Sequence, residues 1–479
     1  MSTRQNHQIR AIAIGVLGFL VMIWNLGTPS LWQDEAATVA ASNRPLSSLL
    51  KLITNVDAVH GLYYGIIHFW GSAFGFSPFA IRVPSAIAVA ISTYLLYFLA
   101  LKLSKSTIVA VWGPIVFLAL PRTHMSGSEA RSNALTATIA ISLVFAFIWA
   151  LENHKSWRRW LAFALLSALS IYLFMFSALI FAAFGTYLLL KKREALLAFL
   201  AAALASLALA APVLIYGFRE QGQVGWITAK PIYQYLWEAG VGVDYNRAWP
   251  MAVLGCLLIL LAALKRASIL LLLWAILPSV LLITVSLMVK PYFVDHYLTF
   301  TTPATAILIA IGINALRWPR AGKAKTLALQ TSVGVVLVAL CIPSFIASRE
   351  PGAKGTEWAQ IAQAIRLNSS PGDSVLLPNA DSKTSRALDL MIVAYAPEFV
   401  ELNDLTLKLK PENTRLLFGR RIRENLAPEP VSRSVLQVTD PQSDPSTKDD
   451  SPTWLKRDFK LSKVIHFDSA DMSVFIRSH

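Results

Sequence analysis

Long apolar runs recur through the first 346 residues and are separated by short polar segments. A helix that crosses a bilayer needs about 20 mostly apolar residues. Hydrophobic residues make up 55% of the chain and charged residues only 15%. This part of the chain is therefore predicted to be an all-α polytopic membrane domain of about eleven spans, at residues 9–27, 79–101, 107–121, 133–151, 159–174, 175–190, 195–216, 250–264, 267–289, 297–316 and 326–346.

The charges between these runs alternate between two sides. With a cytoplasmic N-terminus, the inner segments carry most of the Lys and Arg residues, among them Lys102, Lys105 and Lys191, whereas the outer segments hold most of the acids. Cytoplasmic loops carry such an excess of Lys and Arg. The pattern predicts a multi-pass plasma-membrane protein with a cytoplasmic N-terminus and an extracytoplasmic C-terminal region.

The net charge of +15 raises the question of a nucleic-acid partner. A nucleic-acid groove needs basic residues gathered on one face, and single-stranded nucleic acid also needs aromatic side chains on which bases stack. The basic residues here instead follow the ends of apolar runs, and no basic stretch is interleaved with aromatic residues. No nucleic-acid partner is expected. Membrane lipid is the expected partner.

Residues 60–75, HGLYYGIIHFWGSAFG, are also apolar enough to cross. A crossing here would move every later basic cluster to the outer side. Tyrosine, histidine and tryptophan suit a helix that lies in the membrane interface. The segment is therefore predicted to be an interfacial helix in the first outer loop.

The composition becomes polar from about residue 350. Helix signals at 361–369 and 385–396 alternate with short strand signals at 371–378, 463–467 and 473–476. The sequence thus predicts a transmembrane domain over 1–348 and a small extracytoplasmic α/β domain over 349–479. The second domain has no Gly-rich phosphate loop, so nucleotide binding of that kind is not supported.

The outer segments contain carboxylates, cations and aromatic side chains. A charge close to a bilayer is costly and marks a functional-site candidate. An enzyme that moves a sugar from a lipid phosphate needs a carboxylate to take the proton of the acceptor hydroxyl and cations to hold the departing phosphate. The candidates are Asp34 and Glu35 as catalytic residues, and His60, Tyr63, Tyr64, Glu129, Arg131, Lys290 and His296 as substrate-binding residues.

These candidates have structural alternatives. Asp34 could be a helix N-cap, and Arg131 could form a salt bridge with Glu129. Interfacial tyrosines such as Tyr63 and Tyr64 occur without any chemistry.

Glu35 could orient Asp34, bind an ion or face water. A divalent metal such as Mg²⁺ is chemically reasonable among these acids, but the loops contain no Asp-x-Asp pattern. The metal question stays open, and a mechanism based on Asp34 alone requires no metal.

Four stretches together carry a family resemblance: LWQDEAAT after the first run, HGLYYGIIHFWGSAFG followed by FAIRVPSAIA, then SEARSNAL, and HYLTFTTPA. Over roughly the first 310 residues the chain resembles the GT-C superfamily, in particular membrane glycosyltransferases like protein O-mannosyltransferases and lipid A aminoarabinose transferases. The resemblance implies a GT-C-type transmembrane domain with helices near 35–52 and 60–75 along the membrane. It also implies a catalytic role for Asp34 and places a family arginine at Arg131.

The sequence departs from this family at two positions. Many relatives have arginine where this chain has His296, so phosphate contact there is expected to be weaker, pH-dependent or taken over by Lys290. The short hairpin near residues 172–177 reads YLFMFS, where relatives carry polar residues.

The expected function is transfer of a sugar from a polyprenyl-phosphate donor to an acceptor on the outer face. Mannose is the first donor expected, and arabinose or another pentose the second. The acceptor would be a cell-envelope polysaccharide, a glycolipid or a protein. A transporter or lipid flippase is the alternative, but the candidate polar residues lie in outer loops and no internal repeat is evident. A non-catalytic subunit is a further alternative, and the presence of both Asp34 and Arg131 argues against it.

Overall fold

A computed structural model describes residues 3–246, 248–265, 267–318, 322–377, 383–439 and 451–478. The chain divides into two compact units. The first unit consists of residues up to Leu26, the short segment Val59–Tyr63, and Arg82–Ser348. The second unit consists of Gly27–Ala58, Tyr64–Ile81 and Arg349–His479.

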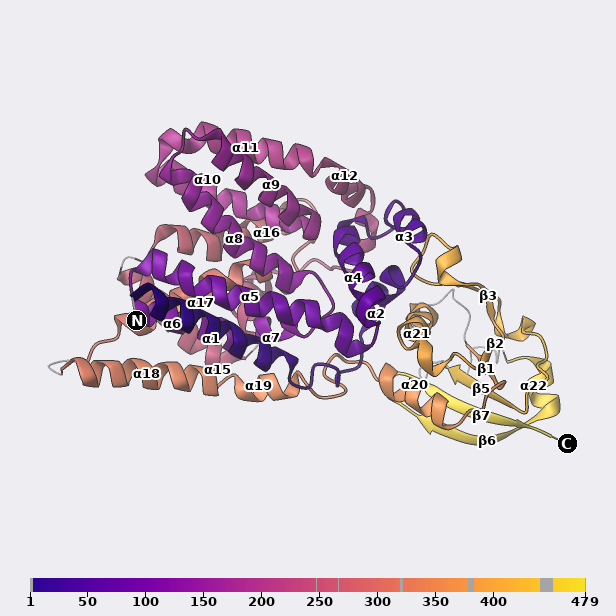
Figure 1. The fold of residues 1–479 in the computed structure, drawn as a ribbon. Helices are drawn as coiled ribbons and strands as arrows, with labels where there is room; N and C mark the ends of the chain where they lie inside the picture. Colours follow the sequence, from indigo (N-terminus) through magenta and orange to yellow (C-terminus); the bar gives the residue numbers. More distant parts are fainter. Residues whose placement is uncertain are drawn as a thin grey trace. The chain divides into compact units, whose positions relative to one another are not determined.

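The first unit is a bundle of apolar helices (Figure 1). Its core is one large cluster of buried aliphatic and aromatic side chains. Helices α18 and α19 run along one edge of the bundle, and α9, α10 and α11 lie together at another. Its helices are α1 (Thr3–Ile23), α5 (Pro78–Ser104), α6 (Thr107–Ala119), α7 (Pro121–Gly127), α8 (Asn133–Glu152), α9 (Trp157–Leu173), α10 (Ile180–Lys191), α11 (Leu196–Leu209), α12 (Ala211–Arg219), α13 (Ile232–Trp237), α14 (Val243–Tyr245), α15 (Trp249–Leu264), α16 (Ile269–Met288), α17 (Thr302–Ala315), α18 (Lys323–Ala339) and α19 (Ile342–Ala347).

Two packing features hold this bundle together. Phe147 of α8 stacks on Phe184 of α10, with ring centroids 4.3 Å apart, and Phe163 and Phe199 of the neighbouring helices pack around them. Aromatic pairs at such distances add to the stabilisation gained from buried area. Elsewhere α15 and α17 approach so closely that a Cβ atom at Gly312 would overlap the backbone carbonyl of Leu258.

Each predicted span coincides with a helical segment, and the fold class predicted from the sequence is confirmed. Among the described residues, six helices are long and apolar enough to cross a membrane, and up to nine spans result if each of three bent helix pairs counts as one. The predicted count of eleven also includes α9 and the segment Met175–Lys191. Basic residues border the stretch 159–190 at both ends, so both ends are expected on the same side of the membrane and the stretch crosses twice. Each of its two helical segments is therefore short, at 17 residues. The chain is a multi-pass membrane protein.

Two predicted outer segments contain more helix than expected. The segment after α6 is the short helix α7, bent by 65° from α6. The segment between the predicted spans 195–216 and 250–264 contains α13, a π-helical turn at Glu238–Gly242 and α14.

The second unit contains a five-stranded sheet of order β2-β1-β5-β7-β6. Strands β2 and β5 pair with β1 in parallel, whereas β7 pairs antiparallel with both β5 and β6. In Figure 1, α20 and α21 lie beside this sheet. The elements are α20 (Trp358–Leu367), β1 (Ser374–Leu376), α21 (Lys383–Ala394), β2 (Asn403–Asp404), β3 (Leu407–Leu409), β4 (Arg420–Arg421), β5 (Ser434–Thr439), α22 (Thr453–Asp458), β6 (Phe459–His466) and β7 (Asp471–Arg477). The helices and strands predicted after residue 350 are present.

The first outer loop forms part of this second unit. It supplies α2 (Gln33–Ser42), α3 (Leu46–Ile53) and most of α4 (Gly61–Phe74). Tyr395 at the end of α21 accepts a hydrogen bond from the backbone N–H of Leu31 at 2.8 Å. The Ser48 hydroxyl donates to the carbonyl of Glu412 at 2.7 Å. The compact units therefore differ from the predicted domains, which assigned all of residues 1–348 to the transmembrane part.

Candidate functional site

The first unit brings three of the predicted residues together. His60 ends the 3₁₀ turn Ala58–His60, and Arg131 lies two residues before α8. The guanidinium Nη2 of Arg131 donates to Nε2 of His60 over 2.9 Å. A ring nitrogen that accepts this bond belongs to a neutral imidazole.

The electrostatics of His60 agree with this geometry. Burial of the ring, followed by the positive charge of Arg131 and the nearby His296, lowers the pKa of His60 well below its ordinary value of 6.5. A neutral base is favoured wherever desolvation and like charges oppose protonation. His60 is thus an uncharged hydrogen-bonding group beside two groups that can carry positive charge.

His296 is held by a chain of polar contacts. The carboxylate of Asp295 accepts the backbone N–H of His296 at 2.6 Å, and its Oδ1 lies 3.4 Å from Nδ1 of the imidazole. The other oxygen of Asp295 is 3.0 Å from Nη2 of the almost fully buried Arg122. Arg122 also donates to the carbonyls of Gly242 and Val243, at 2.8 and 2.5 Å. The fixed guanidinium orients the carboxylate, and the carboxylate orients His296.

The hairpin tip between α9 and α10 contributes aromatic rings to this region. Tyr297 stacks on Phe176 with centroids 5.1 Å apart and a 19° interplanar angle, and Phe174 lies 5.4 Å from Tyr297. His296 meets the edge of Tyr297 at 5.0 Å. The apolar tip that departs from the family pattern therefore packs against the residue next to His296.

Two further candidates in this unit make other contacts, and a third is buried. Lys290 donates to the carbonyl of Gln221 at 2.8 Å and lies 5.9 Å from the ring centroid of Tyr292. The backbone carbonyl of Glu129 accepts a hydrogen bond from the Ser85 hydroxyl at 2.6 Å. Tyr63 is buried.

The second unit contains the predicted carboxylate pair. Asp34 and Glu35 occupy the first turn of α2, where negative charge is favoured by the helix dipole. The N-cap is Trp32, so the interpretation of Asp34 as a helix N-cap is wrong.

Glu35 has no exposed surface, and its Oε2 lies 3.1 Å from Nζ of Lys354. The alternative that Glu35 faces water is therefore also wrong. Tyr64, which is buried as well, donates its hydroxyl proton to Asp57 at 2.8 Å.

Four residues that take part in these contacts were not among the site residues chosen from the sequence: Arg122, Asp295, Asp57 and Lys354. The first three lie in outer segments beside selected residues, so proximity in sequence could have indicated them. Lys354 follows the last predicted span and lies about 320 residues from Glu35, and no local pattern links the two.

Among the described residues, no group of three or more His, Cys, Asp or Glu side chains is arranged to hold a metal ion. The reaction proposed for this protein uses only side chains of the chain.

Comparisons with known proteins identify the fold. A family model described as dolichyl-phosphate-mannose-protein mannosyltransferase matches residues 62–216. A comparison with curated protein sequences finds no match.

The solved structures similar to this chain include two of ArnT from Cupriavidus metallidurans. The apo structure has a TM-score of 0.61 at 13% identity, over 99% of this chain and 98% of that one. The structure bound to undecaprenyl phosphate has a TM-score of 0.55 at 11% identity, over 97% of each chain.

The archaeal oligosaccharyltransferase AglB from Archaeoglobus fulgidus, in complex with an inhibitory peptide and a dolichol-phosphate, is also similar. Its TM-score is 0.50 at 12% identity, over 80% of this chain and 63% of that one. The chain therefore has the GT-C fold, and its resemblance to the GT-C superfamily of membrane glycosyltransferases is confirmed.

Proposed function

We propose that this protein is a membrane glycosyltransferase that moves a sugar from a polyprenyl-phosphate donor to an acceptor on the outer face of the plasma membrane. The fold supports this proposal, because similar structures contain bound undecaprenyl phosphate or dolichol-phosphate. The match of residues 62–216 to a family that uses a lipid-phosphate mannose donor supports it further.

The observation that carries the proposal is the contact between Arg131 and His60 beside His296. A phosphate monoester or diester is bound best by a guanidinium, which offers two parallel N–H donors. The hydrogen bond to the neutral imidazole of His60 holds the guanidinium of Arg131 in place. His296 and Lys290 are further groups that contact the lipid phosphate, and Tyr63, Tyr64 and Glu129 contribute to the sugar and acceptor sites.

The proposed reaction is a direct displacement at the anomeric carbon. Asp34 accepts the proton of the acceptor hydroxyl, and the oxygen of that hydroxyl attacks the carbon on the face opposite the phosphate. The bond from carbon to phosphate oxygen breaks, and its electron pair leaves with the lipid phosphate. Arg131 and His296 stabilise the negative charge that develops on this group. The sugar is transferred with inversion, and buried Glu35 orients the first turn that carries Asp34.

Mannose is the donor sugar proposed first, with arabinose or another pentose second. The acceptor is a cell-envelope polysaccharide, a glycolipid or a protein. The N-terminus lies in the cytoplasm and residues 349–479 form an extracytoplasmic α/β domain, because this orientation places the basic clusters inside.

The test is sugar transfer by the purified protein in lipid nanodiscs. Radiolabelled polyprenyl-phosphate mannose and polyprenyl-phosphate arabinose are supplied separately, together with a cell-envelope extract as acceptor. We expect label to reach the acceptor with one donor, and loss of that transfer in an Arg131→Ala variant. The proposal would be contradicted if neither donor were hydrolysed or used for transfer while the labelled lipid moved across the bilayer. That result would favour a flippase.

A further inference from the structure

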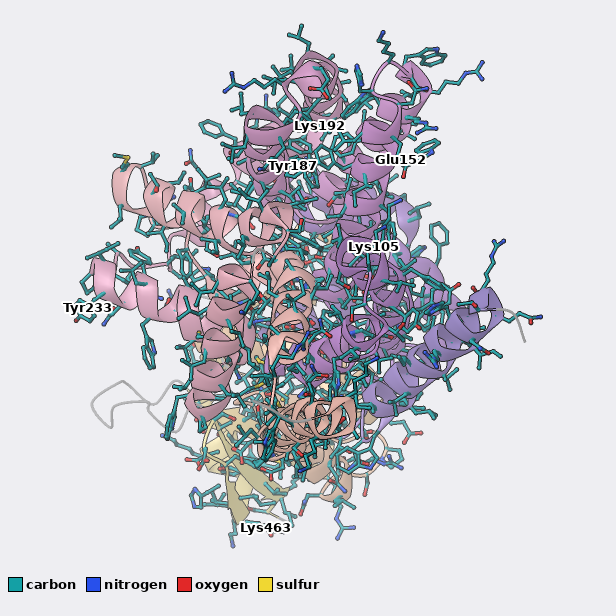
Figure 2. The ribbon with its side chains drawn as sticks, turned by 90° about the vertical axis from the view of Figure 1, so that its left-hand side faces the viewer. Lys105, Glu152, Tyr187, Lys192, Tyr233 and Lys463 are labelled. Atoms are coloured by element: carbon teal, nitrogen blue, oxygen red, sulfur yellow. The ribbon has the colours of Figure 1, made fainter. Side chains whose placement is uncertain are left out.

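A cleft of about 410 Å³ opens at the end of the first unit where α5, α8 and α10 end and α16 begins. Three lysines line it: Lys102 in the last turn of α5, Lys105 directly after α5, and Lys192 directly after α10. Figure 2 faces this end of the bundle and labels Lys105, Glu152, Tyr187 and Lys192. The cleft thus gathers basic side chains from two helix ends.

The cleft carries a net positive charge. Glu152 is its one acidic lining residue, and Nζ of Lys102 lies 2.8 Å from it. Lys192 lies 3.7 Å from Glu194, but both side chains are more than half exposed, and such surface pairs are weak. Lys105 makes no ion pair with any residue that the structure describes. Two ammonium groups are therefore available to an anion.

The helix ends at the cleft carry partial charges of both signs. The C-terminal ends of α5, α8 and α10 carry partial negative charge, which the lysines offset. Ser268, also in the cleft lining, is the N-cap of the 20-residue helix α16, whose N-terminal end carries partial positive charge. Its side chain makes no capping hydrogen bond. The start of α16 therefore adds to the attraction for an anion.

The other walls of the cleft are apolar. They are formed by Leu103, Ile148, Leu151, Tyr187 and Leu270. A site with ammonium groups on one side and aliphatic walls on the other suits a ligand that combines an anionic headgroup with hydrocarbon chains. Basic pockets between transmembrane helices bind anionic lipid headgroups in this manner.

The cleft is separate from the candidate functional site. Arg131 lies just before the first residue of α8, whereas Ile148 and Glu152 lie in its last turns. A helix of 20 residues spans about 30 Å, which is the thickness of the hydrocarbon core. The two places therefore lie at opposite ends of a membrane-spanning helix.

We propose that this cleft binds the headgroup phosphate of an anionic glycerophospholipid from the leaflet at this end of the bundle. Lys105 and Lys192 hold the phosphate, and the apolar walls pack against the upper part of the acyl chains. The charge bias of the chain places this end on the cytoplasmic side. The proposal does not depend on the sugar-transfer activity.

The test is lipid binding to the full chain, measured by native mass spectrometry from detergent. Phosphatidylglycerol and phosphatidylcholine with identical acyl chains are titrated separately, with glycerol phosphate as a soluble competitor. The test variant combines Lys105→Asn with Lys192→Gln. Asparagine is chosen because it tolerates the left-handed backbone at position 105, where φ is 57°. Removal of a lysine near a membrane surface weakens anionic lipid binding about fivefold.

We expect wild-type protein to prefer phosphatidylglycerol, and the double variant to bind it about 25-fold more weakly, with phosphatidylcholine binding unchanged. Replacement of the same two lysines by arginine should retain the preference. A matched control, Lys155→Gln with Arg158→Gln, removes two exposed charges that do not line the cleft, and should behave as wild type. Equal binding of both lipids, equal losses in the control, or full displacement by glycerol phosphate would overturn the proposal.

Discussion

The neutral state of His60 gives the protein a specific response to acid. In the folded protein, burial and the charges of Arg131 and His296 keep the pKa of His60 well below 6.5. In the unfolded chain the imidazole returns to its ordinary pKa. Below about pH 6.5 the unfolded state therefore binds a proton that the folded state does not, so stability is lost as the pH falls. About one pH unit above 6.5, both states are almost fully neutral and the effect vanishes.

The size of this effect follows from proton linkage. Each pH unit below the unfolded pKa costs the folded state about 1.4 kcal/mol while folded His60 stays neutral. Between pH 7.5 and pH 5.0 the total approaches about 2 kcal/mol, which is a large share of a typical unfolding free energy of roughly 5–15 kcal/mol. A His60→Gln variant removes this term, because the amide oxygen of glutamine accepts the Arg131 hydrogen bond without titrating.

The assay is equilibrium denaturation in detergent micelles at a series of pH values. Wild type should lose up to about 2 kcal/mol more than His60→Gln between pH 7.5 and pH 5.0. The control is Asn6→Gln, which changes an exposed side chain that does not titrate and should leave the pH dependence parallel to wild type. Parallel curves for wild type and His60→Gln would refute the assignment of a neutral His60 against Arg131.

Three further substitutions test other contacts. Arg131→Gln should raise the KM for the lipid-phosphate donor about 10- to 150-fold in initial-rate measurements, because charge-assisted hydrogen bonds contribute about 1.5–3 kcal/mol; an unchanged KM would exclude phosphate contact. Asp295→Asn leaves buried Arg122 without its carboxylate, which should lower the unfolding free energy by about 3 kcal/mol, and wild-type stability would show that the pair is dispensable. Lys354→Met should destabilise through buried Glu35, and adding Glu35→Gln should recover much of the loss in a double-mutant cycle; strict additivity would show that the two are not coupled.

Much of the first unit could be predicted because bilayer thickness and charge bias act on short stretches of sequence. Apolar length places α5, α8 and α16 within a few residues of their observed ends. The association of the first outer loop with the C-terminal region could not be predicted. It depends on bonds such as that of Leu31 to Tyr395, between residues 364 positions apart, and no local pattern indicates them.

In the candidate site, too, local sequence indicates some features and others depend on the tertiary structure. Local context and family resemblance indicated Asp34 and Arg131. The pairing of Arg131 with a neutral histidine depends on the tertiary structure, because the two residues lie 71 positions apart. A sequence indicates which side chains can carry charge, but burial and neighbouring charges decide which of them do. His60 illustrates this, because its type permits either state and its surroundings favour the neutral one.

In the proposed reaction, Asp34 accepts the proton of the acceptor hydroxyl during sugar transfer. The measurement is the single-turnover transfer rate of Asp34→Asn in nanodiscs, alongside donor binding to the same sample. Asp468→Asn, the same change at an exposed position of the second unit, serves as the control and should transfer as wild type. We expect the rate of Asp34→Asn to fall about 100- to 10,000-fold with donor affinity retained, because loss of a general base has this effect. A transfer rate close to wild type would exclude Asp34 as the general base.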